Sequence, residues 1–284
     1  MDTANKIAII TDSSCDLSQE QLLMHNIHLL SLRVITTKGE YRDRLEISEE
    51  ALYTLMETEL PKTSLPLPED VTALYTKLHH EGTTHVIHVC ISSGLSGTYN
   101  MVQLVTKEFE QKMQIALIDS QTLSTGLGMM VLEAAESLEA GLSFEEAVER
   151  AKAVRKTQLG MFIIKTLEFL RKGGRIGLVE GAVGTILHIK PIIFINSKGV
   201  YQTLAKARGY ANALDTMVRE AVARFGKRSI HLSVVHGASA LEAQKLLERL
   251  NGVLNIADSF ISSVSPALAV HTGPGLLGIV AHEA

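Results

Sequence analysis

The regular alternation of apolar runs with helix-patterned segments constrains the fold of this chain more than any other feature. Residues 6–11 (KIAIIT), 84–91 (THVIHVCI) and 113–120 (MQIALIDS) are short, continuous apolar runs of the strand type. Helix-patterned segments, such as 71–82 and 97–111, alternate with them. This repetition predicts βαβ units and a parallel sheet, and continuous apolar strands suit a sheet that is covered on both faces. We therefore expect an N-terminal, Rossmann-like α/β domain.

The second half of the chain has a different rhythm. Residues 190–209 (KPIIFINSKGVYQTLAKARG) predict two strands joined by a turn at Asn196–Gly199. The final segment, 257–284, predicts a strand, a turn and a strand. These hairpin patterns favour a C-terminal α/β domain with a mixed or antiparallel sheet.

The length of the chain predicts two domains. The chain has 284 residues, and domains typically contain roughly 100–200 residues. We expect the boundary where the rhythm changes, which gives domains at 1–162 and 163–284. Within the first domain, residues 27–36 (IHLLSLRVIT) predict one further strand.

Composition and charge exclude several classes of protein. The formal net charge is −4 and no long block of like charges occurs, so we expect no nucleic-acid partner. No window approaches the roughly 18–20 apolar residues of a membrane-spanning helix, so we expect no stable membrane insertion. The apolar run near the N-terminus is shorter than the roughly 7–15 residues of a signal peptide core. Cys15 and Cys90 lie far apart in the sequence, which is typical of a reduced, cytoplasmic protein.

Residues 91–100 (ISSGLSGTYN) crowd serines and glycines between a predicted strand and a predicted helix. They lack the G-x-S-x-G spacing of a hydrolase nucleophile, because Gly97 directly follows Ser96, and no lysine follows the glycines as in a phosphate loop. The unpaired N–H groups and the positive dipole end of a helix start can bind an anion. The segment fits an anion site and a simple helix cap equally. A serine esterase or thioesterase using Ser96 or Ser93 stays a third possibility.

Three further segments carry candidate polar groups, and each also has a purely structural interpretation. The proline-rich LPKTSLPLPED would hold the Thr63 hydroxyl stiffly, or would simply lead into a helix. His271 stands beside a Gly-Pro turn, as a ligand contact or as an ordinary loop histidine. Arg171 and Arg175 in LRKGGRIG, with Arg208 further on, could contact an anion or an acidic partner, or remain solvated. No spacing of histidines, cysteines or carboxylates matches a metal site.

Seven segments along the chain, taken in this order, resemble the DegV family: TDSSCDL, PKTSLPLPED, ISSGLSGTYN, Asp119-Ser120, LEFLRKGGRIG, KPI and HTGPGLLG. The resemblance implies a two-domain α/β protein that encloses one long-chain fatty acid, such as palmitate, at the domain junction. It also implies the binding subunit of a bacterial fatty acid kinase. A separate, ATP-dependent catalytic subunit would phosphorylate the bound carboxylate, and this chain would carry the acyl phosphate. The chain would then be a carrier and not an enzyme, with no cofactor.

The resemblance also assigns residues, motif by motif. The implied carboxylate-binding residues are Thr63, Ser96, His271 and Ser93. The implied docking residues for the kinase are Arg171, Arg175 and Arg208. One departure is Leu67, which stands where the family pattern has a serine and is expected to change the rim of the site. Independently of the family, a cluster of neutral hydroxyls suits a carboxylate that must be held and still react.

Overall fold

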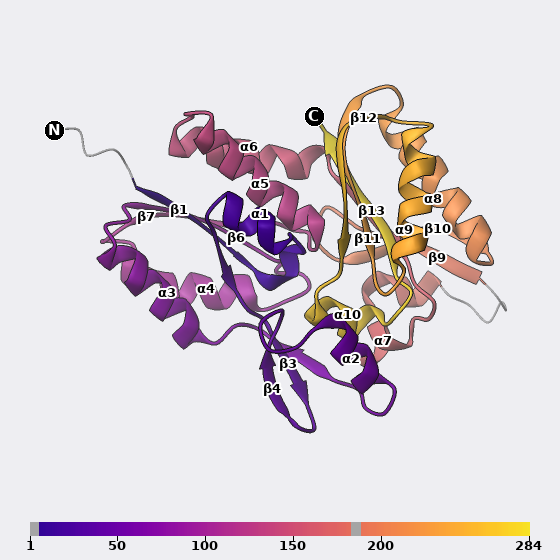
Figure 1. Cartoon of the computed structure of the whole chain (residues 1–284), viewed down its shortest axis with the longest axis horizontal. Coiled ribbons are helices and arrows are strands. Elements are labelled where there is room, and N and C mark those ends of the chain that lie inside the picture. Colours follow the sequence, from indigo (N-terminus) through magenta and orange to yellow (C-terminus); the bar gives the residue numbers. More distant parts are fainter. Residues whose placement is uncertain (1–5, 183–188) are drawn as a thin grey trace.

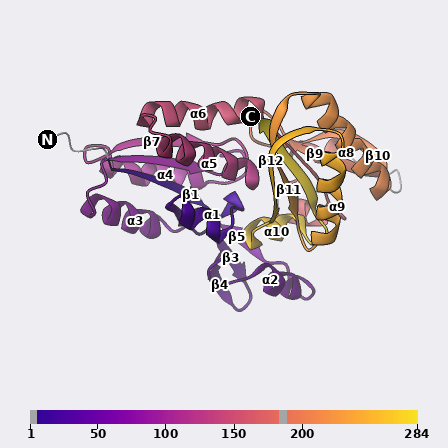
Figure 2. The same ribbon diagram turned by 45° about the horizontal axis from the view of Figure 1, so that its top comes forward.

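The structure is a computed structural model that describes residues 6–182 and 189–284. Its strands form three sheets: four strands in the N-terminal half, six strands in the C-terminal half, and a small three-stranded sheet. The two larger sheets lie side by side, and the small sheet projects from the N-terminal half near their junction in both views (Figures 1 and 2).

The N-terminal sheet has the strand order β2-β1-β6-β7, and every neighbouring pair is parallel. Its strands are β1 (Ile7–Asp12), β2 (Ile27–Leu30), β6 (His85–Cys90) and β7 (Gln114–Asp119). The parallel, Rossmann-like sheet predicted from the alternating pattern is therefore confirmed. Because all four strands run the same way, their carboxyl ends share one edge, where ligands of such sheets collect.

Helices cover both faces of this sheet. They are α1 (Gln19–Met24), α3 (Pro68–His80), α4 (Thr98–Thr106), α5 (Thr125–Glu139) and α6 (Phe144–Thr157), with the short 3₁₀ helices η1 (Ser13–Cys15) and η2 (Lys107–Phe109). Side chains alternate along a strand, so Ile10 packs with Tyr75 beneath α3 and α4, whereas Ile9 packs with Leu127 beneath α5. The alternation explains why the strands are apolar on both faces.

The predicted single strand at 27–36 is wrong, because the chain changes sheets in the middle of that run. β2 ends at Leu30, and β3 (Arg33–Thr36) starts the small antiparallel sheet of order β4-β3-β5. Between them the Leu32 N–H donates to the Ser13 Oγ atom, 3.0 Å away, instead of to a neighbouring strand. The other elements of this lobe are β4 (Gly39–Arg42), α2 (Glu49–Met56) and β5 (Lys62–Ser64).

The C-terminal sheet has the order β10-β9-β8-β13-β11-β12, and only β11 and β12 pair in parallel. Its strands are β8 (Leu159–Ile163), β9 (Ile189–Ile195), β10 (Tyr201–Arg208), β11 (Ser229–His236), β12 (Asn255–Ser263) and β13 (Leu277–Glu283). The predicted mixed sheet is confirmed, and so is the β9–β10 turn, where the Gly199 N–H donates to the Asn196 carbonyl. The boundary expected after residue 162 falls inside β8, a strand of this sheet.

One apolar core spans the two halves. The C-terminal helices are α7 (Glu168–Lys172), η3 (Gly177–Ala182), α8 (Tyr210–Phe225), α9 (Ala240–Asn251) and α10 (Pro266–Thr272). Helices α8 and α9 bury one face of the six-stranded sheet. The opposite face contributes Phe162, Val235 and Val280 to the same cluster as Leu127 of α5. The two halves therefore pack through a shared apolar layer.

The prediction of strand, turn and strand for 257–284 is wrong in its middle, where the structure places α10. Pro266 occupies the first helical turn, after Ser265 in an extended conformation, and Gly273 at φ +67° ends the helix. Helix α10 packs against α2 and α7 at the junction of the two halves (Figure 1). Within residues 6–182 and 189–284, no helix combines the length and apolar character needed to cross a membrane.

Candidate functional site

A polar pocket lies where β5, the loop after β6, the segment after α7 and helix α10 meet. It is lined by Leu32, Thr63, Ser64, Leu65, Ile91, Leu95, Ser96, Gly97, Leu123, Arg175, Tyr201, Ala267, Leu268 and His271. The structure thus brings together Thr63, Ser96 and His271, which come from three distant parts of the sequence.

Two of these side chains contact each other directly. The Thr63 Oγ1 and His271 Nε2 atoms are 2.8 Å apart, across 208 positions of sequence. Thr63 is held by β5, in which it pairs with Val34 of β3. His271 is held by α10. The contact therefore joins the small lobe of the N-terminal half to the C-terminal half.

Two buried carboxylates fix the start of α10. The Ser265 N–H donates to Asp16, and the Ala267 N–H donates to Asp43, at 2.8 and 2.9 Å. Asp16 also accepts a hydrogen bond from Ser124, the residue that precedes α5. Burial raises the pKa of Asp16 to about 7 and that of Asp43 to about 6, although these hydrogen bonds oppose the shift. The acidic residues near the N-terminus thus position His271 indirectly.

His271 is neutral at physiological pH, because burial, and secondarily Arg175, lowers its pKa to about 4. Its Nδ1 atom is buried and has no hydrogen-bond partner within residues 6–182 and 189–284. That edge of the ring lies against Gly173, where a Cβ atom would stand only 2.2 Å from Nδ1. Glycine at position 173 is therefore required for the imidazole to sit where it does.

Ser96 lies in the loop between β6 and α4, and its hydroxyl has one side-chain partner. The Ser96 Oγ and Thr98 Oγ1 atoms are 2.9 Å apart, and the Thr98 N–H also points to Ser96 Oγ at 3.3 Å. The loop is held from behind by the β9–β10 turn, because the Ser92 hydroxyl donates to the Gly199 carbonyl at 2.7 Å. A rigid loop presents the Ser96 hydroxyl to the pocket.

Ser93 does not line the pocket. Its hydroxyl donates to Asp119 at the end of β7, with an Oγ–Oδ2 distance of 2.5 Å. In the part of the chain that the structure describes, neither serine has the histidine partner of a serine hydrolase, since the pocket histidine contacts Thr63. Among these residues, the geometry gives the esterase alternative no general base of this type.

The three arginines expected to dock a partner occupy different settings. Arg175 is half-buried and reaches into the polar pocket, where its Nη1 atom donates to the Gly173 carbonyl at 2.6 Å. Arg171 borders a separate surface hollow that also contains Lys165 and Lys190. Arg208 is exposed at the end of β10. The pocket therefore contains one cation that sequence reasoning assigned to the surface.

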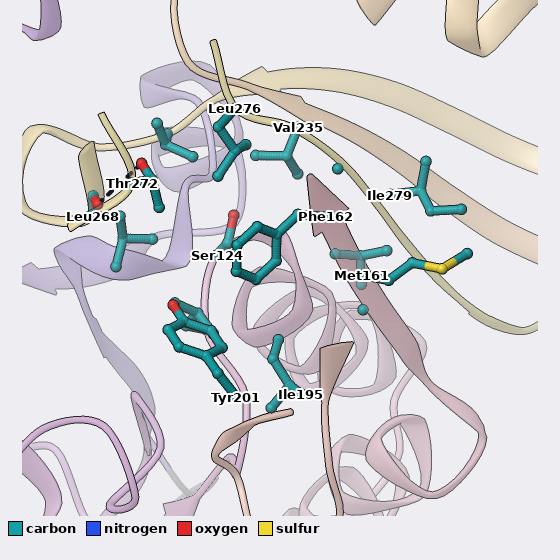
Figure 3. A pocket seen from close by; sticks show the side chains of 15 residues that line it. Ser124, Met161, Phe162, Ile195, Tyr201, Val235, Leu268, Thr272, Leu276 and Ile279 are labelled. Atoms are coloured by element: carbon teal, nitrogen blue, oxygen red, sulfur yellow. Dashed lines mark hydrogen bonds between the residues drawn. The ribbon is translucent and has the colours of Figure 1, made fainter. Parts of the chain in front are cut away.

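An apolar cavity adjoins the polar pocket, and Figure 3 shows the side chains that line it. It is lined by Leu123, Ser124, Gly160, Met161, Phe162, Ile195, Tyr201, Val235, Val264, Leu268, Thr272, Leu276, Gly278, Ile279 and Val280. Tyr201, Leu268 and Thr272 stand at one end, and Met161 and Ile279 stand at the other (Figure 3). Most of the lining belongs to the inner face of the six-stranded sheet and to α10.

The two cavities share the lining residues Leu123, Tyr201 and Leu268. A ligand can therefore place a polar end beside Thr63 and Ser96 and an apolar end in the sheet-lined cavity. Sequence reasoning missed these three residues, because nothing in their local patterns separates them from ordinary core positions. In the part of the chain that the structure describes, no cluster of three or more histidine, cysteine or carboxylate side chains is placed to hold a metal ion.

Comparisons with known proteins place the chain among related proteins. The model of the DegV family, described as an uncharacterised protein family, matches residues 6–284. A DegV domain-containing protein of Clostridium acetobutylicum is 41% identical over 275 residues, covering 97% of this chain and 98% of that protein.

Two solved structures are similar over nearly their whole lengths. One is a fatty-acid-binding DegV family protein from Thermus thermophilus, with a TM-score of 0.92 and 31% identity over 98% of this chain and 100% of that chain. The other is a stearic-acid-binding protein from Eubacterium ventriosum, with a TM-score of 0.89 and 26% identity over 98% of each chain. The match of the family model over residues 6–284, together with these relatives, shows that the chain belongs to the DegV family.

Proposed function

We propose that this protein binds one long-chain fatty acid, with the carboxylate in the polar pocket and the acyl chain in the apolar cavity. The observation that carries the proposal is that the two cavities adjoin and share the lining residues Leu123, Tyr201 and Leu268. The family relatives that are described as fatty-acid-binding proteins support it.

The acyl chain supplies most of the binding free energy. Burying an apolar chain contributes about 0.8 kcal/mol per CH₂, so about fourteen methylenes contribute on the order of 11 kcal/mol before ordering is subtracted. A hydrogen bond to a charged group adds only about 1.5–3 kcal/mol. The polar pocket therefore mainly orients the head group, while the apolar cavity holds the ligand.

The polar pocket suits a carboxylate that must remain reactive. The Thr63 and Ser96 hydroxyls are neutral donors, and neutral His271 supports one of them. Among the described lining residues, Arg175 is the one that carries a positive charge. One guanidinium favours an anion over the neutral acid without enclosing both carboxylate oxygens in cations, which would reduce their nucleophilicity.

We further propose that a separate, ATP-dependent fatty acid kinase subunit phosphorylates the bound carboxylate, and that this protein carries the acyl phosphate. Among the described residues, the Ser93 and Ser96 hydroxyls contact Asp119 and Thr98 and not a histidine, which supports a division of labour in which the partner supplies the chemistry. Cys15 and Cys90 are both buried free thiols, which fits the cytoplasm, where ATP is available.

The kinase would dock on the basic residues near the site: Arg171, Arg175 and Arg208. A pull-down of the kinase subunit with the Arg171→Glu and Arg208→Glu variants tests this role. Arg249→Glu, an exposed arginine on α9, is the matched control. We expect lost capture for the first two variants only, and equal capture by all three would remove these arginines from the docking face.

Calorimetric titration of delipidated protein with palmitate tests the binding itself. We expect about one palmitate per chain, and a weaker, still measurable association for the Thr63→Ala/Ser96→Ala double variant. The same double variant should lower kinase-dependent acyl phosphate formation, because the carboxylate loses its orientation. A wild-type protein that takes up no palmitate would overturn the proposed function.

A further inference from the structure

We propose that Thr98 is a positioning residue that fixes Ser96 as a hydrogen-bond donor, so that the polar pocket selects an ionised carboxylate over an uncharged head group of the same shape. This inference rests on the proposed function and specifies the chemical form of the ligand. It is carried by the direction of the hydrogen bonds around the two pocket hydroxyls.

Ser96 receives hydrogen bonds from Thr98. The Thr98 side chain is completely buried, and among the described residues its hydroxyl has one hydrogen-bond partner, Ser96 Oγ at 2.9 Å. A buried hydroxyl proton needs an acceptor, so Thr98 donates to Ser96. The Thr98 N–H points to the same oxygen at 3.3 Å. With its oxygen occupied by these two donors, the Ser96 hydroxyl directs its own proton into the pocket.

His271 orients the Thr63 hydroxyl in the same way, as a donor toward the pocket. The unpartnered Nδ1 edge of the ring packs against Gly173, and a buried N–H without an acceptor is rarer than an unpaired acceptor. The neutral ring therefore carries its proton on Nε2, which donates to Thr63 Oγ1 at 2.8 Å. No other acceptor for the Thr63 proton exists among the described residues, so that proton also faces the pocket.

Two inward-facing hydroxyl protons match the two acceptor oxygens of a carboxylate. The titratable groups that line the pocket are His271, Arg175 and Tyr201. His271 is neutral, Arg175 is cationic, and burial raises the pKa of Tyr201 so that it too stays protonated. No anionic side chain stands among the described residues that line the pocket. A primary amide has the shape of a carboxylate, but its NH₂ group would face donors and find no acceptor.

Head-group selectivity is measured by competition between palmitate and palmitamide, both delivered from cyclodextrin to delipidated protein. A site built around matched hydrogen bonds rejects an analogue that leaves them unpaired, so we expect wild-type protein to bind palmitamide at least about 100-fold more weakly. Thr98→Val keeps the side-chain shape and removes the hydroxyl. We expect it to lower palmitate affinity about three- to tenfold, on the scale of one neutral hydrogen bond, and to narrow the discrimination against the amide. Thr98→Ser keeps the hydroxyl, so its palmitate affinity and its discrimination against the amide should match those of the wild type.

The ionisation of the bound ligand gives a readout that loss of packing would not move. The ¹³C carboxyl signal of [1-¹³C]palmitate is followed against pH in the wild-type, Thr98→Val and Thr98→Ser complexes. Donors to the charged form lower a carboxyl pKa, so we expect a higher ligand pKa in Thr98→Val and the wild-type value in Thr98→Ser. Identical titrations and identical amide discrimination in Thr98→Val would overturn the inference. Wild-type protein that binds no palmitate would instead overturn the proposed function.

Discussion

Replacing Gly173 with alanine is expected to displace His271 from its contact with Thr63 in the polar pocket. Gly173 ends α7 at φ −77°, a backbone conformation that alanine adopts without strain. A Cβ atom at this position would stand 2.2 Å from His271 Nδ1 and 2.9 Å from Cε1. Ordinary contact begins at 3.4 Å, so the imidazole must move by about 1.2 Å.

This displacement is large relative to the tolerance of the hydrogen bond it affects. The Thr63 Oγ1 and His271 Nε2 atoms are 2.8 Å apart, and a separation beyond 3.5 Å no longer counts as a hydrogen bond. Losing one neutral hydrogen bond costs about 0.5–1.5 kcal/mol, which is about 2- to 12-fold in affinity. The acyl chain stays buried, so palmitate binding should weaken within this range and persist.

Calorimetric titration with palmitate measures the effect, and Gly252→Ala is the matched control. Gly252 ends α9 at the same φ of −77°, but the nearest atom to a Cβ there is 3.5 Å away. If the effect passes through His271, Gly173→Ala should add nothing in a His271→Ala background. Equal affinities for the Gly173→Ala and Gly252→Ala variants would refute the reasoning, as would an undiminished effect in the double variant.

Three further predictions follow from the same geometry. Gly160→Val places a side chain against Ile195 in the wall of the apolar cavity. Competition binding should therefore show a larger loss of affinity for palmitate than for dodecanoate, and equal losses would contradict this prediction. Ser93→Ala should leave palmitate affinity unchanged in calorimetry, because its hydroxyl faces Asp119, whereas Ser96→Ala should lower it. The pKa of Asp16 rises from 3.8 to about 7 on folding. Between these two pH values the folded protein binds more protons than the unfolded chain, so its stability falls as the pH rises from about 4 to about 7. Thermal unfolding of Asp16→Asn between pH 4 and pH 8 should show a flatter dependence than the wild type, and an identical slope would exclude Asp16 as its source.

The two larger sheets could be predicted because the apolar pattern of each strand lies within the strand's own sequence. The runs that became β1, β6 and β7 are apolar on both faces, as a doubly covered parallel sheet requires. The break between β2 and β3 could not be predicted in this way. The apolar pattern continues across it, and the bond that redirects the chain comes from Ser13, a residue distant in sequence.

Helix α10 was missed for a different reason. Residues typical of helix boundaries are present in the sequence, but the segment between them is short. Pro266 at its start and Gly273 at its end are ordinary helix boundaries, yet the seven residues of the helix begin with an apolar run that also fits a strand. The site residues on the matched motifs came together as the resemblance implied, for Thr63, Ser96 and His271. The position of Arg175 depends on how the loop after α7 folds over the pocket, which no local pattern encodes.

Mass spectrometry of the purified native protein shows whether the two adjoining cavities hold one fatty acid. We predict a mass increment of one long-chain fatty acid per chain, lost on denaturing extraction and recovered when the delipidated protein is offered palmitate. Protein that carries no lipid, and takes none up when it is offered, would contradict this prediction.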